Sequence, residues 1–359
     1  MPYRAGIIAC GGIAREHARA WLATPGVKLA ALADSDPAGL DRFAHDFDVA
    51  PENCYTDYRE MLDREDLDIV SVCSWHGQHA EMTVAAAARS PKVILCEKPM
   101  AVSLGEADAM ITAAQRNGVK LAISHMRRFY TGWEQARRVV LSGEIGAPRR
   151  VWSFIRDGLL NWGTHTIDGM RFVMGDPAAE WVVGNVERKT DRHERGIRIE
   201  DSCAGVIAFA NGAHAVIESD LTPYGSINFE IVGSEGILQV DENQVRVLAA
   251  GRGWRELEVP GDETFSTPFV AQARGIVDWL DGRIADAEFR NTASNGRATL
   301  EIMMAIYESA RRHEQVRLPL QTRLSPLDLM VENGDLTIER PGAYDIRSFL
   351  VRGEGMSWR

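Results

Sequence analysis

The chain has 359 residues, which is more than one ordinary hydrophobic core serves, so we expect two domains. Its 51 acidic and 40 basic residues give a formal net charge of −11. This balance argues against a nucleic-acid-binding protein, because such proteins present a basic surface to phosphates. No apolar run is long enough to cross a membrane, and the first residues show no signal-peptide pattern. We therefore expect a cytoplasmic protein with neither a membrane nor a nucleic acid as partner.

The cysteines and histidines predict neither a disulfide framework nor a metal site. The five cysteines form no Cys-x-x-Cys pair, and we expect all of them to be reduced and structural: Cys10, Cys54, Cys73, Cys96 and Cys203. His76 and His79 come closest to metal-ligand spacing, but no carboxylate or cysteine cluster accompanies them. We expect no metal.

The first third of the chain alternates short apolar runs with amphipathic segments. Strands are expected at 5–10, 27–33, 68–73, 93–96 and 120–124. Helices are expected at 12–23, 37–46, 57–64, 78–89 and 103–117. This alternation is typical of an α/β fold with a doubly wound parallel sheet, so residues 1–123 are predicted to form a Rossmann domain.

The rest of the chain reads mainly as strands in series. Helices are expected at 133–141 and around His165, and strands at 150–156, 179–188, 202–210, 214–219, 228–233, 236–240 and 245–249. Residues 124–320 are therefore predicted to form an α+β domain with a large, mostly antiparallel open sheet, covered on one face by helices at 267–281 and 294–314. The C-terminal extension, 321–359, contains aromatic and apolar residues, and we expect it to dock on its own or a neighbouring subunit.

A loop with nucleotide-binding character follows the first predicted strand. It consists of Ala9, Cys10, Gly11, Gly12, Ile13 and Ala14. In such turns the first glycine makes the tight bend, the second lets the backbone approach a pyrophosphate, and the third lets the helix pack closely on the strand. Ala9, Gly11 and Ala14 occupy these places here. Ala9 departs from the pattern, and its methyl group is tolerated if φ stays negative.

Asp34 ends the second predicted strand, about 20 residues beyond Ala14. A carboxylate at this point hydrogen-bonds the ribose hydroxyls of a dinucleotide and repels a 2′-phosphate, so NAD is favoured over NADP. The alternative is that Asp34 and Asp36 form a turn or a cap before Pro37, a task that Asp36 alone can perform.

The segment Leu95-Cys96-Glu97-Lys98-Pro99 places a charged pair at the end of an apolar run. Lys98 would stand at the carboxyl edge of a buried strand, where open α/β sheets bind their ligands. An ordinary surface Glu-Lys pair is the alternative. A segment with a histidine, Asn161 to Asp168, follows about one domain later.

Taken together, these segments resemble the Gfo/Idh/MocA family, the glucose–fructose oxidoreductase and inositol dehydrogenase group, over about residues 5–319. The resemblance rests on Gly11-Gly12-Ile13-Ala14, Asp34, Tyr55-Thr56-Asp57-Tyr58 before Leu62, His79 at the head of a helix, Glu97-Lys98-Pro99, Arg128-Phe129, Gly143-Glu144-Ile145-Gly146 and Gly163-x-His165-x-x-Asp168. The order of the motifs is specific, although each motif alone is not.

The resemblance implies a role for each matching residue. Lys98 would lie beside the nicotinamide and the reacting hydroxyl, often before a cis peptide to Pro99, and His165 would accept the hydroxyl proton. The expected cofactor-binding residues are Ala9, Gly11, Gly12, Ile13, Ala14, Asp34, Ser74, Trp75, His79, Glu97 and Lys98. The expected substrate-binding residues are Asn161, Trp162, Asp168 and Arg128.

The chain departs from the family pattern four residues before the histidine, where many members have an aspartate and this chain has Asn161. An amide can orient a sugar hydroxyl but cannot take up a proton, so proton transfer falls to His165 with Lys98 as its electrostatic assistant. Asp168 either orients the ring of His165 or is a first-turn carboxylate favoured by the helix dipole.

A second departure follows the strand at 68–73, where many relatives carry Thr-Pro-Asn and this chain has Ser74-Trp75-His76. Trp75 either packs along the nicotinamide or the substrate, or simply fills space at a strand end. Trp162 is the better candidate for stacking on a sugar ring.

These observations lead to an NAD-dependent dehydrogenase of a sugar, a sugar derivative or a cyclic polyol. One alternative is a glycoside-cleaving enzyme that oxidises a hydroxyl transiently, for which Asp157 or Tyr130 would be the extra base. The other is a noncatalytic nucleotide-binding sensor, against which the retention of Lys98 and His165 counts. By resemblance, we also expect a homodimer or homotetramer through the second-domain sheet.

Overall fold

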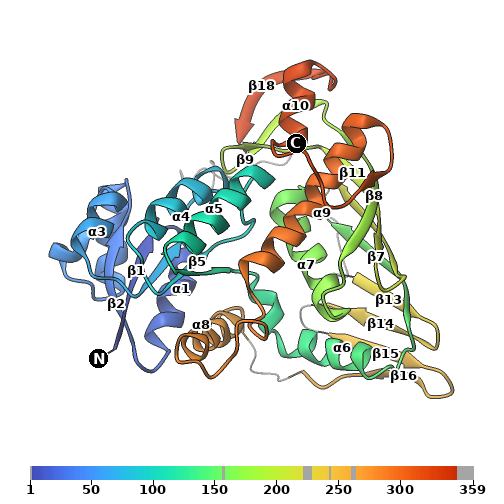
Figure 1. Ribbon diagram of the computed structural model, residues 1–359, viewed down its shortest axis with the longest axis horizontal. Helices are drawn as coiled ribbons and strands as arrows, with labels where there is room; N and C mark the ends of the chain where they lie inside the picture. Colours follow the sequence, from blue (N-terminus) through green and yellow to red (C-terminus); the bar gives the residue numbers. More distant parts are fainter. Residues whose placement is uncertain (1, 156–157, 221–228, 242–243, 260–263, 346–359) are drawn as a thin grey trace. The chain divides into compact units, whose positions relative to one another are not determined.

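The computed structural model describes residues 2–155, 158–220, 229–241, 244–259 and 264–345 (Figure 1). The chain divides into two compact units. The first comprises Met1–Ala101, Glu106–Phe129 and Asp262–Gly296, and the second comprises Val102–Gly105, Tyr130–Gly261 and Arg297–Arg359. Residues 262–296 thus join the first unit, whereas the sequence led us to expect consecutive domains.

The first unit contains a six-stranded parallel sheet, which confirms the Rossmann fold. Its strands are β1 (Tyr3–Ile8), β2 (Val27–Ala33), β3 (Cys54–Tyr55), β4 (Ile69–Val72), β5 (Val93–Cys96) and β6 (Lys120–Ile123). Their order is β3-β2-β1-β4-β5-β6, and each pairing is parallel. The order reverses between β1 and β4, and open sheets of this kind bind ligands at the carboxyl edge beside such a reversal.

The first unit also contains helices, some of which begin at a side-chain cap. They are α1 (Gly12–Leu22), α2 (Pro37–Asp46), α3 (Tyr58–Arg64), α4 (His79–Ala87), α5 (Leu104–Arg116, beginning in the second unit) and α8 (Thr267–Leu280), with short turns η1 (Pro51–Asn53), η2 (His76–Gln78) and η3 (Met126–Phe129). Asp36 accepts a hydrogen bond from Ala38 N and so caps α2, whose first residue is Pro37. Asp57 caps α3 in the same way.

The position of α8 corrects one expectation. We expected the helix at 267–281 to cover the antiparallel sheet, but α8 packs on α1 in the first unit. The ring of Phe269 lies 5.8 Å from the ring of His17. An apolar helix face needs a partner, and the sequence pattern does not show which domain supplies it.

The second unit is built on a nine-stranded sheet. Its strands are β7 (Pro148–Ile155), β8 (Ala179–Glu187), β11 (Ser202–Phe209), β12 (His214–Asp220), β13 (Phe229–Gly233), β14 (Gly236–Val240), β15 (Val245–Ala249), β16 (Gly253–Glu256) and β17 (Val316–Arg317). The order is β16-β15-β14-β13-β7-β12-β11-β8-β17, and β12 with β7 is the parallel pair in this otherwise antiparallel sheet. The predicted fold class is confirmed, although β16 and β17 were not predicted.

Helices cover one face of this sheet. They are α6 (Thr131–Leu141), α7 (Thr164–Val173), preceded by the π-helix η4 (Leu159–Gly163), and α9 (Ala293–Arg312), followed by α10 (Pro326–Asn333). A side chain added at Gly184 or Gly205 would meet Ile306, so glycines on β8 and β11 let α9 approach the sheet closely. Gly169 in α7 similarly makes room for Trp133 of α6.

A small sheet, β10-β9-β18, completes the second unit. A tight turn at Arg195 and Gly196, both with positive φ, joins β9 (Thr190–Glu194) to β10 (Ile197–Arg198). The strand β18 (Arg340–Asp345) pairs in parallel with β9. The described part of the C-terminal extension therefore docks on its own chain, and residues 346–359 lie outside the described residues.

Two further features of the described residues bear on function. No helix among them is both long and apolar enough to cross a bilayer. All five cysteines are free thiols, and Cys73, Cys96 and Cys203 are buried.

Candidate functional site

The loop after β1 has the geometry of a dinucleotide turn, with one correction. Ala9 has a φ of 68°, in the left-handed region, whereas we expected φ to stay negative. Ala9 N donates a hydrogen bond to Ala33 O at 2.8 Å, so the bend that ends β1 is fixed by the neighbouring strand. The turn therefore needs the glycine-like conformation even though an alanine occupies it.

Gly11 and Gly12 fit a backbone that a ligand approaches. Gly11 precedes α1 with a φ of −79°, so its conformation does not require glycine. A side chain added at Gly11 or Gly12 would meet no described protein atom within 4 Å. Neither protein packing nor backbone strain requires glycine at these two positions, and the open space leaves the backbone accessible. The first turn of α1 has no acidic residue and offers its N–H groups to an anion. Ala14 is fully buried where the helix packs on the strand.

Asp34 lies directly after β2 and is half-buried. Its Oδ2 accepts a hydrogen bond from Cys10 N at 2.6 Å, and its Oδ1 accepts one from Asp36 N at 2.8 Å. The carboxylate therefore spans the glycine loop and the turn before α2. It lines a pocket of about 360 Å³ at the carboxyl ends of β1 and β2. The hydrogen bond from Asp36 N shows that Asp34 also stabilises the local turn, which was the alternative role. Asp36 caps α2 by itself.

Arg59, which the sequence analysis did not single out, lines the same pocket. Its guanidinium forms an ion pair with Glu81 and stacks on the ring of Tyr58, with 4.5 Å between the guanidinium carbon and the ring centroid. Glu81 balances the charge of Arg59. The pocket therefore carries an uncompensated carboxylate rather than an uncompensated cation beside β2.

A buried polar chain lies beside the loop that carries Lys98. Glu97 Oε1 lies 2.9 Å from His17 Nε2, and the other ring nitrogen of His17 lies 3.2 Å from Ser71 Oγ. Ser71 Oγ also accepts a hydrogen bond from the indole N–H of Trp21 at 2.9 Å. Burial tends to raise the pKa of Glu97, but the hydrogen bond and charge of His17, together with Lys98, outweigh it and hold that pKa at about 2.

Lys98 is the second residue after β5 and is half-buried. Its backbone N–H donates to Glu97 Oε2 at 3.2 Å, and the Lys98–Pro99 peptide bond is cis, as the resemblance implied. Glu97 itself is buried with its carboxylate toward His17, so it supports the loop. Glu97 therefore positions the backbone of Lys98.

His79 begins α4 and is fully buried. Its Nδ1 lies 2.7 Å from Pro99 O, and its Nε2 lies 3.0 Å from Ser74 O. Burial lowers the pKa of His79, so the neutral ring donates one proton, for which the shorter contact to Pro99 O is the better acceptor. Both ring nitrogens face backbone carbonyls, which places His79 as a clamp between two loops rather than as a direct ligand of a cofactor.

The remaining residues expected in the first unit differ in exposure. Ser74 is buried, whereas Trp75 keeps 36% of its surface exposed at the carboxyl end of β4 and is available for contact. Arg128 is fully buried, and its guanidinium donates to Arg290 O at 3.1 Å while Arg290 donates to Arg128 O at 3.0 Å. Arg128 therefore ties two backbone segments together, which is not the place of a substrate ligand.

In the second unit, His165 lies in the first turn of α7 and is half-buried. The ring of Trp162, in the preceding π-helix, lies edge-on to the ring of His165, with 6.1 Å between the ring centroids. The structure thus brings together two of the residues that the sequence singled out. A π-helix is often associated with a functional site, because the wider turn redirects side chains.

Asp168 lies behind His165 rather than at the surface. It is almost fully buried, and its Oδ1 accepts a hydrogen bond from Thr299 Oγ1 of α9 at 3.1 Å. Arg171 also donates to Thr299 Oγ1, at 3.0 Å. Asp168 therefore belongs to the contact between α7 and α9, which does not suit direct binding of a substrate.

Asn161 is held by a carboxylate that the sequence analysis missed. Its Nδ2 donates to Glu194 Oε1 of β9 at 2.5 Å. A second buried glutamate, Glu200, accepts from Leu159 N at 2.5 Å and from the hydroxyl of Tyr307 at 2.6 Å. Burial raises the pKa of Glu200. Two carboxylates thus fix the π-helix that precedes His165.

Neither His17 nor Glu194 had a recognisable motif around it. The one available signal for His17 was a polar residue on the apolar face of α1, between Ala14 and Trp21. Of the two candidates for an extra base, Tyr130 is buried, and Asp157 lies outside the described residues. No three metal-ligating side chains cluster among the residues that the structure describes.

A doubly wound sheet with this loop, acidic residue and lysine, together with an α+β unit carrying a histidine, defines a two-domain dinucleotide-binding oxidoreductase. Residues 3–125 match the family model described as an oxidoreductase family with an NAD-binding Rossmann fold. Residues 157–318 match the model of that family's C-terminal alpha/beta domain. The chain belongs to the Gfo/Idh/MocA family of oxidoreductases.

Relatives and solved structures agree with this assignment. A D-apiose dehydrogenase of Paraburkholderia graminis is 26% identical over 350 residues, covering 88% of this chain and 90% of the relative. An inositol 2-dehydrogenase of Salmonella typhimurium is 34% identical over 153 residues, or 42% of this chain and 45% of the relative. The structure of an inositol dehydrogenase homologue from Azotobacter vinelandii, in complex with NADH and myo-inositol, shares the fold with a TM-score of 0.78 at 20% identity, covering 88% of this chain and 98% of that chain.

Proposed function

We propose that this oxidoreductase transfers a hydride between nicotinamide and a ring hydroxyl carbon of a sugar, a sugar derivative or a cyclic polyol. The observation that carries the proposal is the place of Lys98, which stands at the carboxyl edge of the sheet on a loop that buried Glu97 and His79 support. The relatives named D-apiose dehydrogenase and inositol 2-dehydrogenase support the substrate class.

The proposed roles follow from the chemistry of each side chain. NAD, when bound, supplies the hydride acceptor. His165 takes the proton from the substrate hydroxyl, since imidazole is the commonest general base. The ammonium group of Lys98 stabilises the charge that develops on the hydroxyl oxygen. Asn161 and Trp162 orient the substrate, by a hydrogen bond and by packing against a ring face.

We assign NAD, rather than NADP, as the preferred cofactor. Gly11, Gly12 and the start of α1 would hold the pyrophosphate. Asp34 would accept hydrogen bonds from the ribose hydroxyls and repel a 2′-phosphate. Trp75, exposed at the end of β4, would contact the nicotinamide or the substrate.

We also propose that the chain forms a homodimer, or a tetramer that contains the same pair, through the outer face of the nine-stranded sheet. Val183, Val206, Val216 and Trp152 are register neighbours on four successive strands. Trp152 is 60% exposed and Val183 is 42% exposed. Such an apolar row on a sheet face is typical of an interface. The five free thiols suit a reducing compartment, and we place the enzyme in the cytoplasm.

The decisive experiment is a substrate panel. Purified protein and NAD are incubated with cyclic polyols, free sugars, sugar acids and glycosides, and NADH is followed by its absorbance. Net accumulation of NADH with one class is the expected result. Cleavage of a glycoside without net NADH formation would identify the transient-oxidation enzyme instead, and no reaction with any compound would favour the noncatalytic sensor.

A further inference from the structure

The contact between Asn161 and Glu194 joins two buried polar side chains that lie 33 positions apart in the sequence. Asn161 keeps 2% of its surface exposed, and Glu194 keeps none. The distance between Asn161 Nδ2 and Glu194 Oε1 is 2.5 Å. A buried carboxylate makes a strong hydrogen bond to a neutral donor, because no water competes for it.

This hydrogen bond sets the direction of the Asn161 amide. Glu194 Oε1 accepts from the NH₂ end of the amide, so the carbonyl oxygen is directed away from Glu194. A substrate reaches only a small part of so deeply buried a side chain. Glu194 therefore determines that the end of the amide facing away from it is an acceptor.

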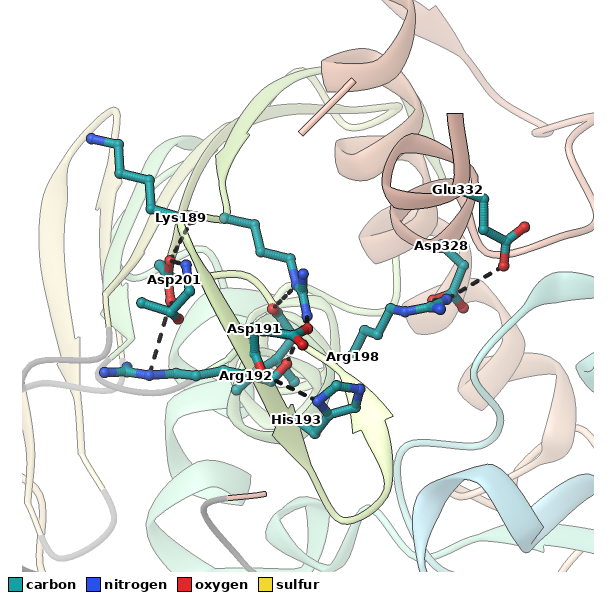
Figure 2. A network of polar contacts seen from close by, with 11 residues as sticks. Lys189, Asp191, Arg192, His193, Arg198, Asp201, Asp328 and Glu332 are labelled. Carbon is teal, nitrogen blue, oxygen red and sulfur yellow. Dashed lines mark hydrogen bonds and ion pairs between the residues drawn. The ribbon is translucent and has the colours of Figure 1, made fainter. Parts of the chain in front are cut away.

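Both partners stand on well-anchored segments. Glu194 is the last residue of β9, the first strand of the hairpin formed by β9 and β10. Arg198, at the end of β10, anchors this hairpin, because its guanidinium lies 2.8 Å from Asp328 and 3.4 Å from Glu332 on α10 (Figure 2). At the other end of the hairpin, Asp201 accepts from the backbone of Lys189 at 2.7 Å (Figure 2). Because the hairpin is tied at both ends, the carboxylate of Glu194 has little freedom to turn away.

We propose that Glu194 is a positioning residue that presents the carbonyl oxygen of Asn161 to a hydroxyl of the substrate, and so selects substrates that donate a hydrogen bond there over deoxy or keto analogues. The inference rests on the proposed function of the site. In physical terms, the carboxylate of Glu194 lies behind the amide of Asn161 and polarises it through their hydrogen bond. A substrate that lacks the hydroxyl leaves a buried acceptor without its donor, which is the stronger form of discrimination.

The first test is Glu194→Gln, which keeps the size of the side chain but offers Asn161 either a donor or an acceptor. We expect KM for the best compound of the panel to rise roughly tenfold, with kcat changed less than about threefold, because the amide of Asn161 is no longer held in one direction towards the substrate. The preference for that compound over its deoxy analogue should fall towards one. Glu200→Gln is the matched control, since it alters the other buried glutamate of the π-helix and should leave the preference unchanged. A wild-type preference in Glu194→Gln would overturn the proposal.

The second test is an unfolding cycle that needs no substrate. Asn161→Asp places two carboxylates in contact and should lower the melting temperature at neutral pH. In the double variant Asn161→Asp/Glu194→Gln, the amide at position 194 donates to the carboxylate at position 161. Most of the lost melting temperature should therefore be recovered. A double variant as unstable as Asn161→Asp would refute the pairing. If wild-type protein turns over no panel compound, the proposed function fails, while the unfolding cycle still decides whether the pair exists.

Discussion

Glu97 Oε1 lies 2.9 Å from His17 Nε2, and this buried contact joins α1, the helix of the dinucleotide loop, to the residue directly before Lys98. The helix after the glycine loop and the loop after β5 are therefore braced against each other inside the first unit. A carboxylate inside a core is costly unless it is paired, and here His17 provides the partner.

The pairing makes a prediction about pH. The pKa of Glu97 is depressed from an ordinary 4.5 to about 2, so its stabilisation is present above pH 4.5 and is lost as pH falls towards 2. Glu97→Gln should lower the free energy of unfolding at pH 7 by on the order of 3 kcal/mol. The difference in free energy of unfolding between wild type and Glu97→Gln should narrow as pH falls below 4.5. Urea unfolding at several pH values measures it, with Glu52→Gln at an exposed site as the control. A gap independent of pH would contradict the assignment.

The catalytic assignment predicts a separation of chemistry from cofactor binding. Lys98→Ala and His165→Ala should each lower kcat by roughly two orders of magnitude or more, because both groups act in the transition state. NAD affinity, measured by calorimetry, should change little. Lys28→Ala and His45→Ala, at exposed positions, are matched controls. Wild-type turnover in either active-site variant would show that the assigned residue does not take part.

Ala9 predicts a stabilising substitution. Its φ of 68° costs an alanine roughly 1–2 kcal/mol relative to glycine, while glycine loses about 0.4–1 kcal/mol through the unfolded chain. Ala9→Gly should therefore raise the free energy of unfolding by about 0.5–1 kcal/mol. Ala14→Gly, in the first turn of α1, should instead lower the free energy of unfolding by about 1 kcal/mol. Urea unfolding of both variants is the measurement, and a destabilised Ala9→Gly would mean that the bend is not left-handed in solution.

The outer sheet face predicts the oligomeric state. Trp152→Glu places a charge at one end of the apolar row and should convert the proposed dimer to a monomer, as measured by light scattering during size-exclusion chromatography. Phe265→Glu alters an aromatic residue of the first unit that is similarly exposed, at 59%, and should leave the oligomer intact. A Trp152→Glu protein with the mass of wild type would place the interface elsewhere.

The sequence predicted those elements whose signals are local. The strands β2 and β5 have the predicted bounds, because each is a short apolar run, and α2 begins as expected because Asp36 and Pro37 form a cap. The hairpin of β9 and β10 was missed, since its residues are almost all polar and only Gly196 marks the turn. Local pattern carries no information about a strand that is stabilised by neighbours from α10 and β18.

The candidate site divides in the same way. The glycine loop and Asp34 were recognisable because their chemistry lies within one short strand–helix–strand unit, from β1 to the end of β2. The buried pairs were not, because His17 lies 80 positions from Glu97, and Asn161 lies 33 positions from Glu194. Such contacts arise only when the fold brings distant segments together.

Cofactor choice gives the last prediction. Asp34 accepts from the backbone of the glycine loop and lines the pocket at the end of β2, while Arg59 in the same pocket is paired with Glu81. A 2′-phosphate placed about 4 Å from this carboxylate would meet a repulsion of roughly 4 kcal/mol in a partly buried setting. Wild-type protein should therefore bind NAD more tightly than NADP.

Substitution of Asp34 should erode this preference in steps. Asp34→Ala should weaken NAD, because the ribose hydroxyls lose their acceptor, and should relieve the repulsion of NADP. The double variant Asp34→Ala/Ser35→Arg should carry the change further, since a guanidinium grips phosphate with two hydrogen bonds. Asp36→Ala is the matched control, because it removes the cap of α2 and should cost stability without altering the preference. Titrations of both cofactors against the four proteins measure the ratio. Equal wild-type affinities, or a ratio that Asp34→Ala leaves unmoved, would reduce Asp34 to its contacts with Cys10 and Asp36.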